Sequence, residues 1–230
     1  MAKDKKNPPT LTPRRTVHGL RTTASEPDRW ADAVRHLRRA DPHLREVIKR
    51  IGPCRLAPRL DRFGTLVNSI VAQQISSKAA ASINLRLHAL GGQPHQPERL
   101  LGLGVTGLRS VGLSAAKARY VLNLAEAVVD GSVPLDAFDD SWEDAAIVAS
   151  LTSVKGIGIW TAEMFLIFSL NRPDVLPVHD LGVRAALRDR HGLADLPKPS
   201  QCHALAEAWR PYRTIASWYL WRNVDTPQVK

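Results

Sequence analysis

Residues 154–180, VKGIGIWTAEMFLIFSLNRPDVLPVHD, contain the side chains and spacing best suited to chemistry. Gly156 and Gly158 flank a single residue just before an expected helix, and Asp180 follows Trp160 by 20 residues. Glycine permits positive φ and close approach of another backbone. Free N–H groups at a helix N-terminus bind anions such as phosphate. A carboxylate nearby could stabilise positive charge or orient a water molecule. The segment therefore combines an anion-binding turn with a possible catalytic carboxylate.

Each of these features also has a purely structural explanation. Gly-x-Gly turns are common between helices, and an Asp directly before a helix is a frequent N-cap. For Asp180, capping of a helix that begins at Leu181 and a catalytic role are compatible. Asp174, in an Arg-Pro-Asp turn, is expected to organise its loop, and His179 is expected to be peripheral.

The elements around this segment are predicted to be helical. Apolar residues recur at helical spacing, as at positions 30, 33, 34 and 37. Asp41-Pro42 is typical of a helix start, with a capping residue before a proline. No alternating strand pattern is sustained, so the sequence predicts an all-α fold. Further helices are expected over about 63–71, 77–90, 115–129, 141–149, 160–170, 181–190 and 200–224.

Composition narrows the classes of protein that the chain could represent. With 230 residues and 44% hydrophobic residues, it can form one large domain or two small ones. A formal net charge of +10 favours a polyanionic partner. About half of that charge lies in residues 1–25, so charge alone does not separate DNA, RNA and a basic enzyme. Two cysteines exclude a disulfide framework and a four-cysteine cluster.

The N-terminal residues 1–27 are expected to form a disordered basic tail, followed by a folded region over 28–230. The tail could be a solubilising segment or a non-specific contact to DNA. No apolar run is long enough for a membrane span, and the N-terminus lacks the apolar core of a signal peptide. A reduced, cytoplasmic location is therefore expected, nucleoid-associated in a bacterium or nuclear in a eukaryote.

Five ordered motifs between about Asp41 and Asn223 resemble one protein family. This is the helix-hairpin-helix (HhH-GPD) superfamily of DNA glycosylases, in its 3-methyladenine DNA glycosylase II branch. The resemblance implies two helical subdomains that flank a DNA-binding cleft, about 62–175 and 28–61 plus 176–230. It also implies a short form that lacks the extra N-terminal domain of larger members. The matching motifs are Gln73-Gln74-Ile75-Ser76, Gly112-Leu113-Ser114-x-x-Lys117, Gly156-Ile157-Gly158-Ile159-Trp160-Thr161-Ala162, Pro177-Val178-His179-Asp180 and Trp209-Arg210-Pro211-Tyr212-Arg213.

The resemblance implies a specific reaction, hydrolysis of the bond between an alkylated base and its sugar. Asp180 occupies the catalytic position of the family, and Trp160 stands where bifunctional members carry a nucleophilic lysine. The expectation is therefore a monofunctional glycosylase that leaves an abasic site. A lyase acting through Lys155 is poorly placed, because that residue precedes the glycines of the turn. A catalytically silent DNA-binding module is the alternative, although it would need no carboxylate at position 180.

The extruded base is expected to stack in an electron-rich pocket, because many alkylated bases are cationic. The expected pocket residues are Trp160, Met164, Trp218 and Trp221, each of which could instead be core packing. The sequence departs from the family's aromatic pocket at Met164, Leu181 and Gly182, which predicts a more open pocket. Gln74 aligns with the wedge that fills the gap left by the base.

The resemblance also assigns contacts to the DNA backbone. Phosphate contacts are expected from Lys155, Gly156, Gly158 and Ser76. A structural Na⁺ or K⁺ would bind the backbone carbonyls of Thr152, Val154 and Ile157, and no other cofactor is expected. The partner would be double-stranded DNA that contains alkylated bases, and engagement by a single hairpin requires only a monomer.

Overall fold

The computed structural model describes residues 29–225, and all regular structure in this range is helical. The predicted all-α fold is therefore confirmed, whereas the expected basic tail over 1–27 lies outside the described residues. Within the described range, no helix has the length and apolar character needed to cross a bilayer. The helices are α1 Ala31–Ala40, α2 Pro42–Ile51, α3 Arg62–Ala72, α4 Ser77–Gly91, α5 Pro97–Ser110, α6 Ala115–Val129, α7 Asp144–Thr152, α8 Ile159–Phe168, α9 Leu181–His191, α10 Pro199–Leu205 and α11 Arg213–Asp225, with short 3₁₀ turns at Leu135–Ala137 and Glu207–Trp209.

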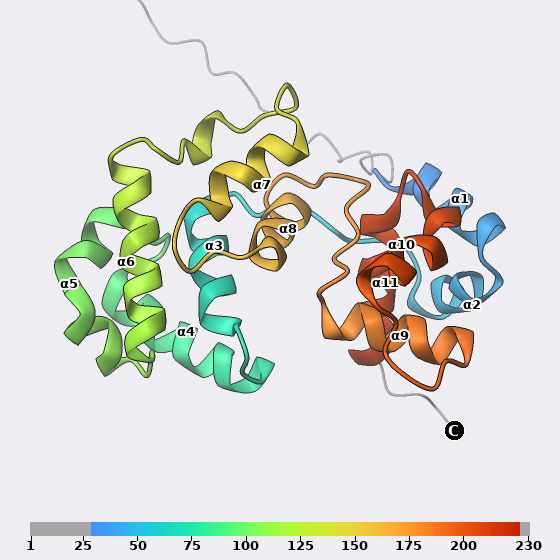
Figure 1. Ribbon diagram of the computed structural model, residues 1–230, viewed down its shortest axis with the longest axis horizontal. Helices are drawn as coiled ribbons and strands as arrows, with labels where there is room; N and C mark the ends of the chain where they lie inside the picture. The colour runs from blue at the N-terminus through green and yellow to red at the C-terminus, as the bar shows by residue number, and fades with distance from the viewer. Residues whose placement is uncertain (1–28, 226–230) are drawn as a thin grey trace, which may run out of the picture.

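The helices lie in two groups, which are separated along the long axis of the molecule (Figure 1). Helices α3 to α8 pack on one another in the first group, and α1, α2, α9, α10 and α11 form the second. The chain passes between the groups twice, before α3 and again between α8 and α9. Asp180 lies at the end of the second crossing, directly before α9.

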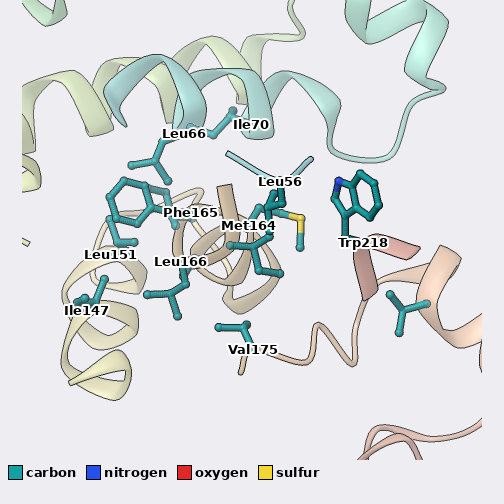
Figure 2. Packing of buried hydrophobic residues seen from close by; sticks show 14 of the residues in the cluster. Leu56, Leu66, Ile70, Ile147, Leu151, Met164, Phe165, Leu166, Val175 and Trp218 are labelled. Atoms are coloured by element: carbon teal, nitrogen blue, oxygen red, sulfur yellow. The ribbon is translucent and has the colours of Figure 1, made fainter. Parts of the chain in front are cut away.

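Helix α8 is the centre of the first group. Its sequence is mostly apolar, and Ala162 and the residues from Met164 to Ile167 are buried. Phe165 and Leu166 lie among apolar side chains of α3 and α7, including Leu66 and Leu151 (Figure 2). This packing fixes the position and direction of α8. Trp160, in its first turn, is thereby held at a defined place at the edge of the group.

Side-chain caps set several helix starts as the sequence predicts. The carboxylate of Asp41 accepts hydrogen bonds from the backbone N–H groups of His43 and Leu44, and Pro42 begins α2. Ser114 caps α6 through the N–H of Lys117. Such caps satisfy N–H groups that have no partner within the helix. These starts are therefore confirmed.

The second crossing segment is fixed by ion pairs to both groups. Asp174 accepts from the Nε of Arg213 at 2.7 Å, and it also pairs with Arg210. Arg172 lies 3.1 Å from a carboxylate oxygen of Asp144, at the start of α7. The expected role of Asp174 in organising its loop is confirmed. These contacts hold the segment that delivers Asp180 to the site.

Candidate active site

Asp180 accepts hydrogen bonds from three donors on three helices. Its Oδ1 accepts from the backbone N–H of Val183 at 2.9 Å and from the indole Nε1 of Trp221 at 2.9 Å. Its Oδ2 accepts from the indole Nε1 of Trp160 at 3.0 Å. The N-cap of α9 and the contact with the tryptophans therefore coexist in one carboxylate, as the sequence allowed.

This arrangement restricts the carboxylate and leaves it one free acceptor position. A carboxylate can accept about four hydrogen bonds, two at each oxygen. Oδ1 of Asp180 uses two and Oδ2 uses one. Trp160 belongs to α8 and Trp221 to α11, so the two helix groups meet at this side chain. The remaining position on Oδ2 is available to a water molecule or to a developing cation.

Gly182 allows the close approach of Trp221 to Asp180. A Cβ at position 182 would lie 3.1 Å from Asp180 Oδ1 and 3.3 Å from Cδ1 of Trp221. The space left by the missing side chain is therefore occupied by the indole, and it does not widen the pocket at this point. Leu181, beside it, is 66% exposed.

A cavity of about 440 Å³ opens beside the carboxylate, and we call it the Asp180 cavity. Gln74, the expected wedge, lines it and adopts φ of 55°, a strained value for a residue with a Cβ. His179, which was expected to be peripheral, is exposed but also lines the cavity. The lining residues are Ala72, Gln73, Gln74, Trp160, His179, Asp180 and Leu181.

Two neighbouring polar side chains hold the loop that carries Gln74. The side-chain amide of Gln73 donates to the carbonyl of Gly156 at 3.1 Å and to the hydroxyl of Thr161 at 3.2 Å. Lys117 Nζ donates to the carbonyl of Val71 at 2.7 Å and to the carbonyl of Gln73 at 2.6 Å. Burial lowers the pKa of this amine. The loop is thereby tied to both the hairpin and α6. This network holds the strained backbone at Gln74 in place.

The hairpin between α7 and α8 requires its first glycine. Gly156 has φ of 108°, and a Cβ there would lie 2.1 Å from Cγ of Tyr120. Gly158 is the N-cap of α8, and among residues 29–225 no hydrogen bond uses the N–H of Gly156 or Gly158. Lys155 is exposed beside them, and Ser76 caps α4 through its hydroxyl. Two free N–H groups and an exposed amine therefore lie together on one turn.

A second cavity of about 440 Å³ shares Ala72 and Trp160 with the first, and we call it the Arg59 cavity. Met164 lines it, as does Phe168, which stacks on Trp221 with ring centroids 5.7 Å apart. Trp218 lines neither cavity; it is 8% exposed and packs edge-on against Tyr219 in the core cluster that Figure 2 shows. The lining residues are Arg59, Asn68, Ser69, Ala72, Ala80, Ala81, Asn84, Trp160, Met164 and Phe168.

A larger cavity of about 530 Å³ lies elsewhere, beside His95 and Asp61, and contains no residue of the Asp180 site. In the described part of the chain, no group of three or more His, Cys, Asp or Glu side chains could hold a metal ion. The Asp180 cavity, by contrast, is lined by a carboxylate together with the aromatic side chains of Trp160 and His179.

Comparison with known proteins identifies the family. A family model described as "HhH-GPD superfamily base excision DNA repair protein" matches residues 67–211, more than half of the chain. The chain belongs to this superfamily. The resemblance drawn from the sequence motifs is thus confirmed.

Individual relatives of this HhH-GPD protein agree with that assignment. DNA-3-methyladenine glycosylase 1 of Schizosaccharomyces pombe is 34% identical over 193 residues, which are 82% of this chain and 85% of the relative. A structure of the 3-methyladenine DNA glycosylase of the same organism, in complex with abasic DNA, matches with a TM-score of 0.77 at 31% identity, covering 86% of this chain and 100% of that one. A DNA-3-methyladenine glycosidase structure from Bacillus halodurans matches with a TM-score of 0.68 at 35% identity, covering 84% and 89%. The HhH-GPD protein is accordingly a DNA glycosylase of base excision repair.

A second carboxyl group, Glu163, was not found by the sequence analysis of this HhH-GPD glycosylase. It lies three residues after Trp160 on α8, and its Oε2 is buried without a hydrogen-bond partner. Burial, and secondarily the charge of Asp180, raise the pKa of Glu163 from 4.5 to about 7. The only sign in the sequence that Glu163 belongs to the site was its position, one helical turn beyond Trp160. Gln73 and Lys117 belong to motifs that were recognised in the sequence. Their contacts could be identified only from the folded structure.

The raised pKa of Glu163 predicts a pH-dependent stability. The folded protein binds this proton more tightly than the unfolded chain does, so the free energy of unfolding falls as pH rises from about 4.5 to about 7. Glu163→Gln removes the titration and should be more stable than wild type by roughly 2 kcal/mol at pH 8, with little difference at pH 4. Denaturant unfolding at both pH values measures this, with the exposed glutamate variant Glu126→Gln as control. An equal difference at pH 4 and pH 8 would contradict the assignment.

Proposed function

We propose that this glycosylase is monofunctional and releases alkylated bases from double-stranded DNA, leaving abasic sites. The observation that carries this proposal is the carboxylate of Asp180, held by Trp160 and Trp221 at the wall of a cavity. The printed names of the relatives, which are 3-methyladenine glycosylases, support the alkylated-base class. The protein would act in the reducing compartment that holds the DNA, which is the cytoplasm of a bacterium or the nucleus of a eukaryote. A monomer would suffice to engage the DNA.

In this mechanism, the damaged nucleotide leaves the duplex and Gln74 fills the gap that remains. Breaking the bond between base and sugar builds positive charge on the sugar. Asp180 Oδ2, with one acceptor position left, stabilises that charge and orients the attacking water. The indole donors of Trp160 and Trp221 keep the carboxylate in one orientation during this step.

The residue types at the site support the proposal that this glycosylase lacks lyase activity. A lyase of this family forms a covalent adduct between a lysine amine and the sugar. Trp160 stands at that position, and its indole N–H is already donated to Asp180. No lysine lines the Asp180 cavity or the Arg59 cavity. Lys155 is exposed on the hairpin, where it suits a phosphate better than the reacting sugar.

The hairpin would bind the DNA backbone through the N–H groups of Gly156 and Gly158. A Na⁺ or K⁺ ion would fit beneath it, because the carbonyl of Thr152 ends α7 and no donor in residues 29–225 bonds to it or to that of Ile157. The carbonyl of Val154 accepts from Ile157 N–H and keeps one lone pair. The ion would neutralise charge near the phosphate, and the three carbonyl groups would hold the ion in place.

Removal of small monovalent cations tests that assignment. Replacing Na⁺ and K⁺ with N-methyl-D-glucamine at equal ionic strength should weaken DNA binding several-fold, because the bulky cation cannot enter a ring of carbonyls. Fluorescence anisotropy with a labelled duplex measures the affinity. Lys155→Ala serves as control, since it should weaken binding equally in both salts. Identical affinities for the wild-type protein in the two salts would rule the ion out.

Asp180→Asn tests the proposed reaction. The neutral amide cannot stabilise the sugar cation, so the single-turnover rate of base release should fall by about 100-fold or more while DNA affinity is retained. Methylated duplex DNA is incubated with protein, and released bases and strand breaks are measured before and after alkali. Asp195→Asn, which changes an exposed carboxylate beyond α9 that lines neither cavity, should keep most of the rate.

The outcomes separate the alternatives clearly. Release of bases by the wild type, with strand breaks only after alkali, agrees with a monofunctional enzyme. Strand breaks without alkali would establish a lyase. Tight DNA binding without any base release, unchanged by Asp180→Asn, would instead identify a catalytically silent DNA-binding protein.

A further inference from the structure

Arg59 places a positive charge at the pocket where a base would stack. It lies between α2 and α3, and its backbone N–H donates to the carbonyl of Phe168 at 2.7 Å. Its guanidinium lies 4.7 Å from the centroid of the Phe168 ring and lines the Arg59 cavity. The residue is thus anchored to the end of α8 by both its backbone and its side chain.

No negative charge compensates Arg59 inside the cavity. Every other lining residue is neutral, and among residues 29–225 no carboxylate forms an ion pair with Arg59. The residue as a whole is exposed, but partial burial of the guanidinium lowers its pKa. An unpaired and partly desolvated guanidinium acts strongly on any charge that enters the cavity.

Arg59 is also close to the reacting centre. Phe168, beneath the guanidinium, stacks on Trp221, whose indole donates to Asp180. Trp160 lines both cavities and donates to the same carboxylate. A base stacked against Trp160 would therefore have Asp180 on its sugar side and could present its outer edge to Arg59.

The rest of the lining can donate or accept hydrogen bonds without charge. Asn68 and Asn84 face the cavity from α3 and α4, and the Oδ1 atom of each is buried without a partner. The hydroxyl of Ser69 is already donated to the carbonyl of Thr65. The unpaired amide oxygens can accept from an N–H group on the edge of a neutral base, and the guanidinium can donate to a carbonyl oxygen of the same base.

We propose that Arg59 makes this pocket favour neutral bases that carry a carbonyl acceptor, such as hypoxanthine, over formally cationic methylated bases. The inference rests on the proposed glycosylase function and extends the substrates of that same site beyond alkylated bases. A methylated cationic purine meets a like charge at Arg59, which raises the free energy of its binding. A neutral purine gains a charge-assisted hydrogen bond to its carbonyl oxygen.

The same charge assists departure of a neutral base. When the bond between sugar and base breaks, its electron pair goes to the base nitrogen, and water supplies the hydroxyl group to the sugar. The remaining proton of that water goes to the departing base when the base is neutral, and to solvent when the base is cationic. A cationic base leaves as a neutral molecule, whereas a neutral base develops negative charge as it leaves. Arg59 stabilises that developing charge. The guanidinium therefore lowers the barrier only for the neutral class.

The test compares two substrates with one set of variants. Single-turnover rates are measured on a duplex with one hypoxanthine and on dimethyl sulfate-treated DNA, from which 3-methyladenine and 7-methylguanine are counted. Arg59→Gln should lower the hypoxanthine rate and raise the methylated-base rate, so that their ratio changes at least tenfold. Arg59→Lys, which keeps the charge, should stay within about threefold of the wild-type ratio. Arg55→Gln, an exposed arginine on the same segment that lines neither cavity, should leave both rates unchanged.

Several results would overturn the proposal. Equal loss of both rates in Arg59→Gln would make Arg59 a phosphate contact or a structural residue. Arg59→Lys behaving like Arg59→Gln would show that charge is not responsible. A wild type that releases methylated bases but no hypoxanthine would also contradict it. Failure of the glycosylase function itself gives a different pattern, in which wild type and Asp180→Asn release neither kind of base.

Discussion

The contact on which the site depends is the carboxylate of Asp180 between two indole N–H groups. Trp160 comes from the buried helix of one group and Trp221 from the last helix of the other. Hydrogen bonds to an ionised carboxylate are stronger than neutral ones, so both groups are held at one point. The two helix groups therefore meet at the carboxylate that we propose to be catalytic.

The DNA-facing parts are coupled to that position by backbone contacts. Gln73 links the wedge loop to the hairpin, and Lys117 holds the same loop from α6. The hairpin in turn begins α8, which carries Trp160. Under the proposed function, phosphate binding, insertion of Gln74 and orientation of the carboxylate would depend on one connected set of polar contacts. A change at Gln73 would disturb all three together.

Much of this could be predicted from the sequence, for identifiable reasons. Helical periodicity and local caps such as Asp41 and Ser114 fixed the fold class and several boundaries, because these signals act within a few residues. The motif around Asp180 identified the family. Arg59 and Glu163 were missed because their significance comes from burial and from neighbours distant in sequence. Gly182 was expected to open the pocket. The space beside it is instead filled by the indole of Trp221, a residue distant in sequence.

The most direct test of this account is the single-turnover rate of base release by Trp221→Phe on saturating damaged DNA. The substitution removes the indole N–H that donates to Asp180 and keeps an aromatic ring, although a smaller one, against Phe168. We expect the rate to fall by about tenfold, the equivalent of one charge-assisted hydrogen bond, with unchanged DNA affinity. A rate equal to that of the wild type would contradict the claim that the two indoles hold the carboxylate for catalysis.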